Sequence, residues 1–218
     1  LLQCCQRPLS CNLRSGQCPD GFCRRFQRWW GAKVTDTQVQ DLSRFRLPPG
    51  FRGRSAFVVQ LWWLVQATAF ARSPQFMYGW RRWLLRLVGA SIGDGVLIRP
   101  SVRITYPWKL TIGDHSWIGD FVELYTLGPI QIERNAVVSQ YCYLCTGSHD
   151  PSTPTFDIFA KQIIVKEEAW LAAGVFIHPG VVIQKGSVVA ARSVVRRSTT
   201  EYGVYGGEPL RFLRDRRL

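Results

Sequence analysis

The chain has 218 residues, of which 46% are hydrophobic and 20% are charged. These values exclude a globally disordered chain and allow the core of one domain of ordinary size. The formal net charge of +13 at pH 7 favours an anionic partner, which can be nucleic acid, an acidic membrane surface or a phosphorylated ligand. Nucleic acid is poorly supported, because no recognition module accompanies the charge.

Residues 1–50 form an N-terminal extension that carries little information. Five of the seven cysteines lie in its first 23 residues: Cys4, Cys5, Cys11, Cys18 and Cys23. Their spacing is not the paired pattern of a zinc site and does not suggest a disulfide framework. We therefore expect no metal here and a cytoplasmic protein. Near the N-terminus we find no apolar stretch that is followed by a small-residue cleavage site. The sequence therefore does not predict a signal peptide.

Residues 51–90 form an apolar and basic helical segment. The stretch "AFVVQLWWLVQATAF" (56–70) is shorter than the roughly 20 apolar residues that a membrane-spanning helix needs. The following "SPQFMYGWRRWLLRLVG" (73–89) places three arginines among tryptophans and leucines. Two interpretations stay open for 56–88. The helices pack on the main domain with their tryptophans in its core, or they lie on a membrane surface, peripheral to the inner membrane face.

Residues 91–200 repeat with a period of six. An aliphatic residue occupies fifteen equivalent positions: Ile92, Ile98, Ile104, Ile112, Ile118, Leu124, Ile132, Val138, Leu144, Val165, Leu171, Ile177, Ile183, Val189 and Val195. A helical face repeats every 3.6 residues, so this period instead fits a short strand and a tight corner. Three such units close one turn, and successive turns stack as parallel strands with the aliphatic side chains inside.

A second position, four residues after the aliphatic one, is usually small or β-branched. Its members are Val96, Val102, Ser116, Val122, Ala136, Cys142, Ser148, Ala169, Val175, Val181, Ser187 and Ser193, with Trp108 as the main exception. The sequence therefore predicts an all-β fold, a parallel β-helix of about five coils. N-terminal helices precede it, and a short basic tail (201–218) follows it.

The rhythm breaks after "YLCTGSHD" (143–150) and resumes near Val165. Residues 150–164 are rich in Pro, Ser and Thr, which predicts a loop without strands. This loop would overhang His149, the residue that ends the third coil.

The repeat pattern [LIV]-G-x-x-[STAV]-x resembles that of the hexapeptide-repeat acyltransferases. The stretches "VLIRPSVRITYPWKLTIGDHSWIGD", "YLCTGSHD" and "EEAWLAAGVFIHPGVVIQKGSVVAARSVV" look most like the colanic-acid and exopolysaccharide O-acetyltransferases and are similar to the maltose and galactoside acetyltransferases. The resemblance covers about residues 44–215. It implies a left-handed β-helix, acetyl-CoA as acetyl donor, and a homotrimer with active sites in clefts between neighbouring subunits.

In that family the catalytic histidine follows a Thr-x-x-His pattern, which here is Thr146 to His149. A neutral imidazole can take the proton of a sugar hydroxyl as it attacks the acetyl thioester, so we expect His149 to be the general base. The resemblance implies that the backbone amide of Ala173 stabilises the oxyanion. No metal is needed. Asp150 could orient His149, although adjacent side chains seldom point the same way.

The two other histidines, His115 and His178, occupy different places in the six-residue unit, and we interpret both as surface residues. There is no pair of histidines separated by four residues. The sequence therefore does not predict a zinc site like that of the β-helical carbonic anhydrases.

The resemblance also implies a site for acetyl-CoA. It places small residues along the pantetheine arm and arginines near the phosphates and adenine, where their charge would pair with phosphate. The residues are Ala173, Ala191, Arg196, Arg197, Arg211 and Arg214. Trp170 would pack against the arm or serve the fold alone. The alternative for the arginines is a solvated basic tail.

The acceptor site is less defined. Asp120, Glu123 and Tyr125 could hydrogen-bond sugar hydroxyls. The acidic residue that holds the acceptor in galactoside acetyltransferases has no counterpart, because Leu127 or Gly128 falls there.

The leading interpretation is an acetyl-CoA-dependent O-acetyltransferase that modifies a sugar of an exopolysaccharide like colanic acid, or its lipid-linked precursor. Two alternatives stay open: acetylation of another small acceptor, such as an antibiotic or serine, and a non-catalytic scaffold. The His149 corner, the loop and the basic tail favour the enzyme.

Overall fold

The computed structural model describes residues 38–217. The cysteine-rich stretch, with its predicted lack of a metal, lies outside the described residues. Ahead of the repeat come a 3-10 turn η1 (Leu42–Arg44), helix α2 (Ala56–Val65), a π-helical turn η2 (Gln66–Phe70) and helix α3 (Tyr78–Leu87). Another 3-10 turn, η3 (Pro107–Lys109), lies within the repeat.

Three parallel sheets form the walls of a solenoid. Sheet A contains β1 (Ser91–Ile92), β4 (Leu110–Ile112), β7 (Ile130–Ile132), β12 (Ile163–Val165) and β15 (Val182–Ile183). Sheet B contains β2 (Leu97–Ile98), β5 (Trp117–Ile118), β8 (Val137–Val138), β13 (Trp170–Leu171), β16 (Val188–Val189), β18 (Gly203–Gly206) and the antiparallel β19 (Arg211–Asp215). Sheet C contains β3 (Arg103–Ile104), β6 (Glu123–Tyr125), β9 (Tyr143–Cys145), β14 (Phe176–Ile177) and β17 (Val194–Val195).

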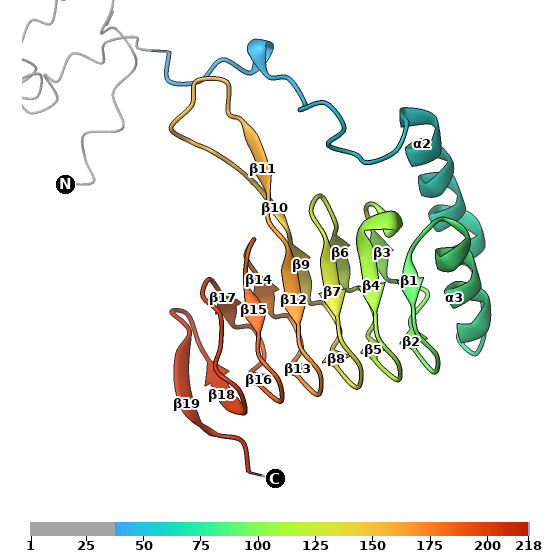
Figure 1. Ribbon diagram of the computed structural model, residues 1–218, viewed down its shortest axis with the longest axis vertical. Helices are drawn as coiled ribbons and strands as arrows, with labels where there is room; N and C mark the ends of the chain where they lie inside the picture. Colours follow the sequence, from blue (N-terminus) through green and yellow to red (C-terminus); the bar gives the residue numbers. More distant parts are fainter. Residues whose placement is uncertain (1–37, 218) are drawn as a thin grey trace, which may run out of the picture. The chain divides into compact units, whose positions relative to one another are not determined.

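Each coil runs from sheet A through sheet B to sheet C and returns to sheet A (Figure 1). Five coils are complete, and β18 adds a strand of a sixth by pairing in parallel with β16. The predicted parallel β-solenoid is confirmed, with about six turns. Three edges join the walls, and we name them A–B, B–C and C–A after the sheets they connect.

The fifteen aliphatic residues form the core, as predicted. Each lies on its own strand and is at most 6% exposed. Ile92, Ile112 and Ile132 stack in register one coil apart. Burying one such side chain contributes about 1.5–3 kcal/mol, so the ladder contributes a large part of the driving force for the fold. The second, small position is also buried, except for Ser148, which is exposed and lies outside the ladder.

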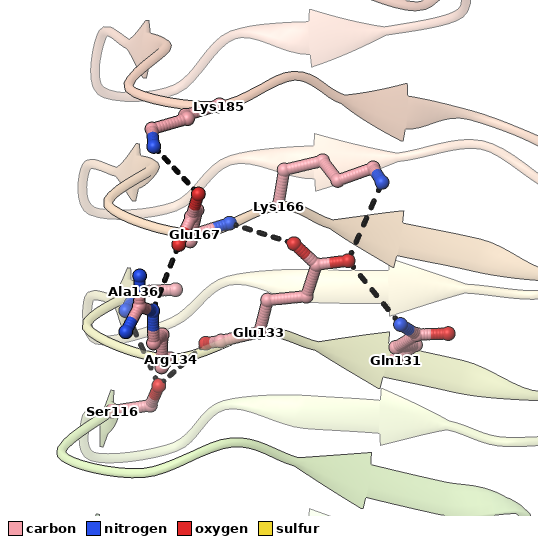
Figure 2. Close-up of polar contacts among 8 residues, drawn as sticks. All are labelled: Ser116, Gln131, Glu133, Arg134, Ala136, Lys166, Glu167 and Lys185. Carbon is pink, nitrogen blue, oxygen red and sulfur yellow. Dashed lines mark hydrogen bonds and ion pairs between the residues drawn. The ribbon is translucent and has the colours of Figure 1, made fainter.

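The A–B edge is tied by charged side chains (Figure 2). Glu167 accepts from Arg134 at 2.8 Å on one side and from Lys185 at 2.6 Å on the other, so it bridges three coils. Glu133 lies 3.4 Å from Lys166 in the same network. These contacts bind coil to coil, and this edge therefore has a structural role.

Helices α2 and α3 cover the first coil (Figure 1). Trp62 is buried in the core and donates its indole N–H to the carbonyl of Ile104 at 2.8 Å. The packed interpretation of 56–88 therefore holds for the helices. The expectation that the tryptophans lie in the core is wrong for three of them. Trp63, Trp80 and Trp83 are 44%, 36% and 52% exposed. Within 38–217, every helix is too short or too polar to cross a membrane.

The predicted loop 150–164 contains strands. Strand β10 (Gly147–His149) turns back as β11 (Ile158–Ala160) in an antiparallel hairpin, and β12 starts at Ile163. The Pro- and Thr-rich residues occupy only the turn. The expectation of a strand-free segment is therefore wrong, because the apolar residues at its end pair with β10 and β7.

Candidate active site

His149 lies at the end of the first arm of this hairpin, which projects from the C–A edge after the third coil (Figure 1). The hairpin is braced from outside. The amide of Asp41 donates to the carbonyl of Pro154 at 2.7 Å, and the ring of Phe45 lies 6.0 Å from that of His149. His149 thus lies on the first strand of the hairpin, beyond the corner of the third coil at which the sequence analysis placed it.

A single backbone carbonyl orients the imidazole. Nδ1 of His149 lies 2.7 Å from the carbonyl oxygen of Phe156, which can only accept, so Nδ1 carries the hydrogen. In the neutral ring Nε2 then holds the free electron pair. The ring also stacks on that of Phe156, with centroids 4.2 Å apart. Asp150 does not orient it, because its carboxylate accepts from the amide and hydroxyl of Ser152.

Ala173 and Ala191 lie on the B–C edge, where successive turns stack. The amide of Arg192 donates to the carbonyl of Ala173 at 2.8 Å, and the amide of Gly174 donates to the carbonyl of Gln140 at 2.9 Å. The amide of Ala173 itself has no acceptor within residues 38–217, and the residue is only half-buried. It is therefore available to an oxyanion.

Asp120 lies on the same edge, but its carboxylate is already engaged. One oxygen accepts from Arg99 at 2.7 Å and the other from Ser101 at 2.8 Å. Asp120 therefore connects the first two coils. Because both of its carboxylate oxygens already accept hydrogen bonds, it is poorly placed to bind a sugar hydroxyl.

One chain does not bring His149 and Ala173 together. Between the two edges runs β9 (Tyr143–Cys145) of sheet C. With its flanking residues, from Cys142 to Thr146, this segment spans about 13 Å at roughly 3.3 Å per residue, and His149 lies beyond it. The base must reach the acceptor hydroxyl while the oxyanion donor reaches the carbonyl oxygen under attack, so the two groups must lie within a few ångström of the same reacting atoms.

The outer face of sheet C carries Glu123 and Tyr125. Glu123 is half-buried, and burial raises its pKa although Arg103 lies 3.5 Å away. Both residues line a groove of about 720 Å³ against α2 and η2. Two aromatic residues that the sequence reasoning missed continue this face. Tyr143 stacks on Phe176 with centroids 5.2 Å apart.

His178 lies next to Phe176, with ring centroids 5.1 Å apart, and is half-buried. Burial lowers its pKa, and the nearby Arg196 lowers it further. His178 is therefore a surface residue, as expected, but a partly covered one. His115 is exposed, as expected.

The outer face of sheet B carries Trp170, which is 45% exposed and donates to Ser139 at 3.0 Å. Two cavities meet at its ring. One of about 580 Å³ includes Trp117 and Arg216, and the other, of about 530 Å³, includes Arg214 and Arg216. Sequence reasoning missed Trp117 and Arg216.

Arg211 and Arg214 lie on β19, where residues three apart would ordinarily face opposite sides. A bulge corrects this. Val204 pairs with Arg214, but its neighbour Tyr205 pairs with Phe212, so Leu213 is the extra residue. Arg211 and Arg214 therefore share the outer face of sheet B.

Arg196 and Arg197 lie elsewhere, on the C–A edge after β17. Arg196 lies 3.3 Å from the carboxylate of Glu208. The four arginines thus form two pairs on different surfaces of one chain. Among residues 38–217 no three potential metal ligands gather.

No family model matches the sequence. The protein WcaF of Escherichia coli (strain K12), provisionally named a colanic acid biosynthesis acetyltransferase, is 57% identical over 178 residues, which are 82% of this chain and 98% of WcaF.

Two solved structures share the fold. A hexapeptide-repeat acetyltransferase of Vibrio cholerae O1 biovar eltor, complexed with acetyl-CoA, superposes with a TM-score of 0.69 at 25% identity, over 76% of this chain and 92% of that one. A galactoside acetyltransferase in complex with coenzyme A gives 0.68 at 20% identity, over 78% and 84% of the two chains.

Proposed function

Because the chain belongs to the hexapeptide-repeat acetyltransferases, we propose that it transfers an acetyl group from acetyl-CoA to a sugar hydroxyl during synthesis of an exopolysaccharide like colanic acid. The name of the 57% identical relative supports the acceptor class. The acetyl-CoA bound to the Vibrio relative supports the donor. This reaction belongs in the compartment that holds acetyl-CoA, the cytoplasm.

The mechanism rests on one observation, the hydrogen bond between Nδ1 of His149 and the carbonyl oxygen of Phe156. Nε2 of His149 accepts the proton of the acceptor hydroxyl as that oxygen attacks the thioester carbonyl carbon. The Ala173 amide donates to the resulting oxyanion. The tetrahedral intermediate then collapses, the C–S bond breaks, and the CoA sulfur takes the proton from the imidazolium. The products are the sugar acetate and CoA, and the base is restored.

The two catalytic groups come from different subunits of a homotrimer in this proposal. His149 and Ala173 lie at opposite edges of sheet C in one chain, so a cleft between two chains can bring one chain's hairpin to the other chain's B–C edge. Trp170, Ala191, Arg211 and Arg214 then line the CoA side of the cleft.

Arg196 and Arg197 are a second candidate pair for the CoA phosphates. The contact between Arg196 and Glu208 makes them the weaker pair, because an incoming phosphate would have to displace a carboxylate. Glu123 and Tyr125 form the acceptor side, with Tyr143 as an added aromatic surface. Their groove offers a carboxylate and a phenol, which suit sugar hydroxyls.

Incubation of the purified protein with acetyl-CoA and oligosaccharides released from colanic acid tests the proposal. We expect free thiol to appear together with a saccharide heavier by one acetyl group. Mild alkali should remove that group, because it cleaves O-acetyl esters and leaves N-acetyl amides. Thiol release with an amino acid or antibiotic acceptor, and none with saccharides, would overturn the acceptor assignment.

A further inference from the structure

The outer sides of α2 and α3 expose large apolar side chains. On α2, Phe57, Leu61 and Leu64 are 76%, 50% and 61% exposed, at the spacing of one helical stripe. On α3, Trp80, Trp83 and Leu87 follow the same kind of spacing. We call these six residues the helix face.

The two stripes adjoin. Leu61 and Leu87 line one groove of about 440 Å³ between the helices, together with Arg54. Trp80 and Trp83 stack with centroids 5.1 Å apart. Soluble monomers rarely expose a contiguous apolar surface of this kind. Such a surface usually marks a site of interaction with a partner or a membrane.

The polar groups of the helices point to the solenoid, which fixes the helix face outward. Arg81 is fully buried and donates to the carbonyl of Ile98 at 2.6 Å. Arg82 donates to Val96, and Arg86 donates to Ile92. On η2, which continues from α2, Gln66 accepts from the amide of Ile104 at 2.7 Å. The apolar stripes are therefore presented by helices that are already anchored.

Charge selects the partner. Between Asp41 and Asp94 the chain has no acidic residue, and its exposed arginines that do not bond to the solenoid are Arg44, Arg46, Arg52, Arg54 and Arg72. A second copy of the same face would set these cations against one another. Residues 1–37 are also net positive, with six Arg and Lys against two Asp.

We propose that the helix face docks on an anionic lipid surface. Its tryptophans and leucines enter the boundary between headgroups and acyl chains, while exposed arginines such as Arg54 and Arg72 pair with lipid phosphates. Each helix has 10 residues, a length that suits lying in the interface. This docking does not depend on the acetyl transfer.

Co-sedimentation of the full chain with vesicles tests the docking. We expect binding to an equal mixture of phosphatidylglycerol and phosphatidylcholine, weakened by high salt, and much weaker binding to pure phosphatidylcholine. The variant Phe57→Gln/Leu64→Gln/Leu87→Gln should bind at least tenfold more weakly. The control Phe121→Asn/Tyr141→Asn removes an exposed aromatic pair on the B–C edge and should bind like the wild type.

A second variant, Arg54→Gln/Arg72→Gln, leaves the apolar stripes intact. It should lose at least tenfold in affinity for the anionic vesicles, since a basic residue near such a surface contributes roughly fivefold. Thermal melts establish that each variant is folded. A wild-type chain that stays in the supernatant would overturn the proposal. So would a change of oligomeric state in the apolar variant, because it would assign the helix face to a second copy.

Discussion

Phe156 holds His149 in two ways: its carbonyl lies 2.7 Å from Nδ1, and its ring stacks on the imidazole at 7° between planes. Phe156 adopts a φ of 52°, a left-handed conformation that costs a residue with a Cβ about 1–2 kcal/mol. The hairpin maintains this conformation and so keeps the carbonyl directed at the ring. The histidine is therefore oriented before any substrate arrives.

The first prediction concerns the base. His149→Ala should lower kcat by about 10²–10⁴-fold, the usual contribution of a general base, and leave the KM for acetyl-CoA nearly unchanged. Steady-state thiol release measures both. His115→Asn is a matched control, because His115 is exposed on another edge and Asn tolerates its φ of 57°. A His149→Ala enzyme with near-normal turnover would remove this residue from the mechanism.

The repeat made the solenoid predictable because one requirement recurs at every strand. Each of the fifteen aliphatic positions requires a side chain that fills the narrow interior of the solenoid. Ser148 departs because it fits the spacing after the chain has already left the solenoid for β10. Sequence spacing alone does not reveal where pairing partners change.

The site was only partly predictable. The break in the rhythm singles out His149 and the segment after it, but it does not reveal that the two pair as a hairpin. Tyr143 was missed, although it pairs in register with Glu123 one coil earlier, and aligning outward positions by coil would have found it. The common face of Arg211 and Arg214 depends on a bulge at Leu213, for which the sequence carries no clear signal.

The second prediction tests the shared cleft. Light scattering should give a trimer. Ala173→Pro removes the amide hydrogen and should lower kcat by about 10²–10³-fold, the value of one oxyanion donor. Co-expression of Ala173→Pro with His149→Ala should restore activity, since about a quarter of randomly formed clefts pair both intact groups.

Melting curves and light scattering are the controls for that pair of variants. Recovery would be absent if both groups acted within one chain, because every chain would then carry one defect. A fully active monomer would also contradict the shared cleft.

The third prediction concerns the A–B edge. Hydrogen bonds from Lys185 and Arg134 lower the pKa of Glu167 below its ordinary 4.5. When folding lowers the pKa of a carboxylate, its charge stabilises the folded state at any pH above the pKa that the group has in the unfolded chain. This contribution is lost as the pH falls through the pKa of the folded state. Glu167→Gln should therefore lower the urea midpoint at pH 7, and the difference from wild type should fade below about pH 4.

Chemical denaturation across this pH range measures the effect, with Glu201→Gln as control because Glu201 is exposed and in no ion pair among the described residues. If the difference between the urea midpoints of wild type and Glu167→Gln persists unchanged in acid, Glu167 stabilises the fold through side-chain packing and not through its charge.

The last prediction concerns Arg211 and Arg214. Because the bulge directs both to the face that carries Trp170, one ligand can meet both guanidinium groups. A charge-assisted contact to phosphate contributes about 1.5–3 kcal/mol. Arg211→Ala/Arg214→Ala should raise the KM for acetyl-CoA by roughly tenfold or more with little change in kcat, whereas Arg52→Ala/Arg54→Ala, an exposed pair near α2, should leave it unchanged.

Two further readouts separate phosphate binding from general charge. The wild type should discriminate against the acetyl thioester of dephospho-CoA, and the double variant should lose that discrimination. Salt should weaken donor binding more in the wild type than in the variant, because screening acts only on charges still present. A variant that kept both its KM and its salt response would assign the phosphates to Arg196 and Arg197, on the C–A edge.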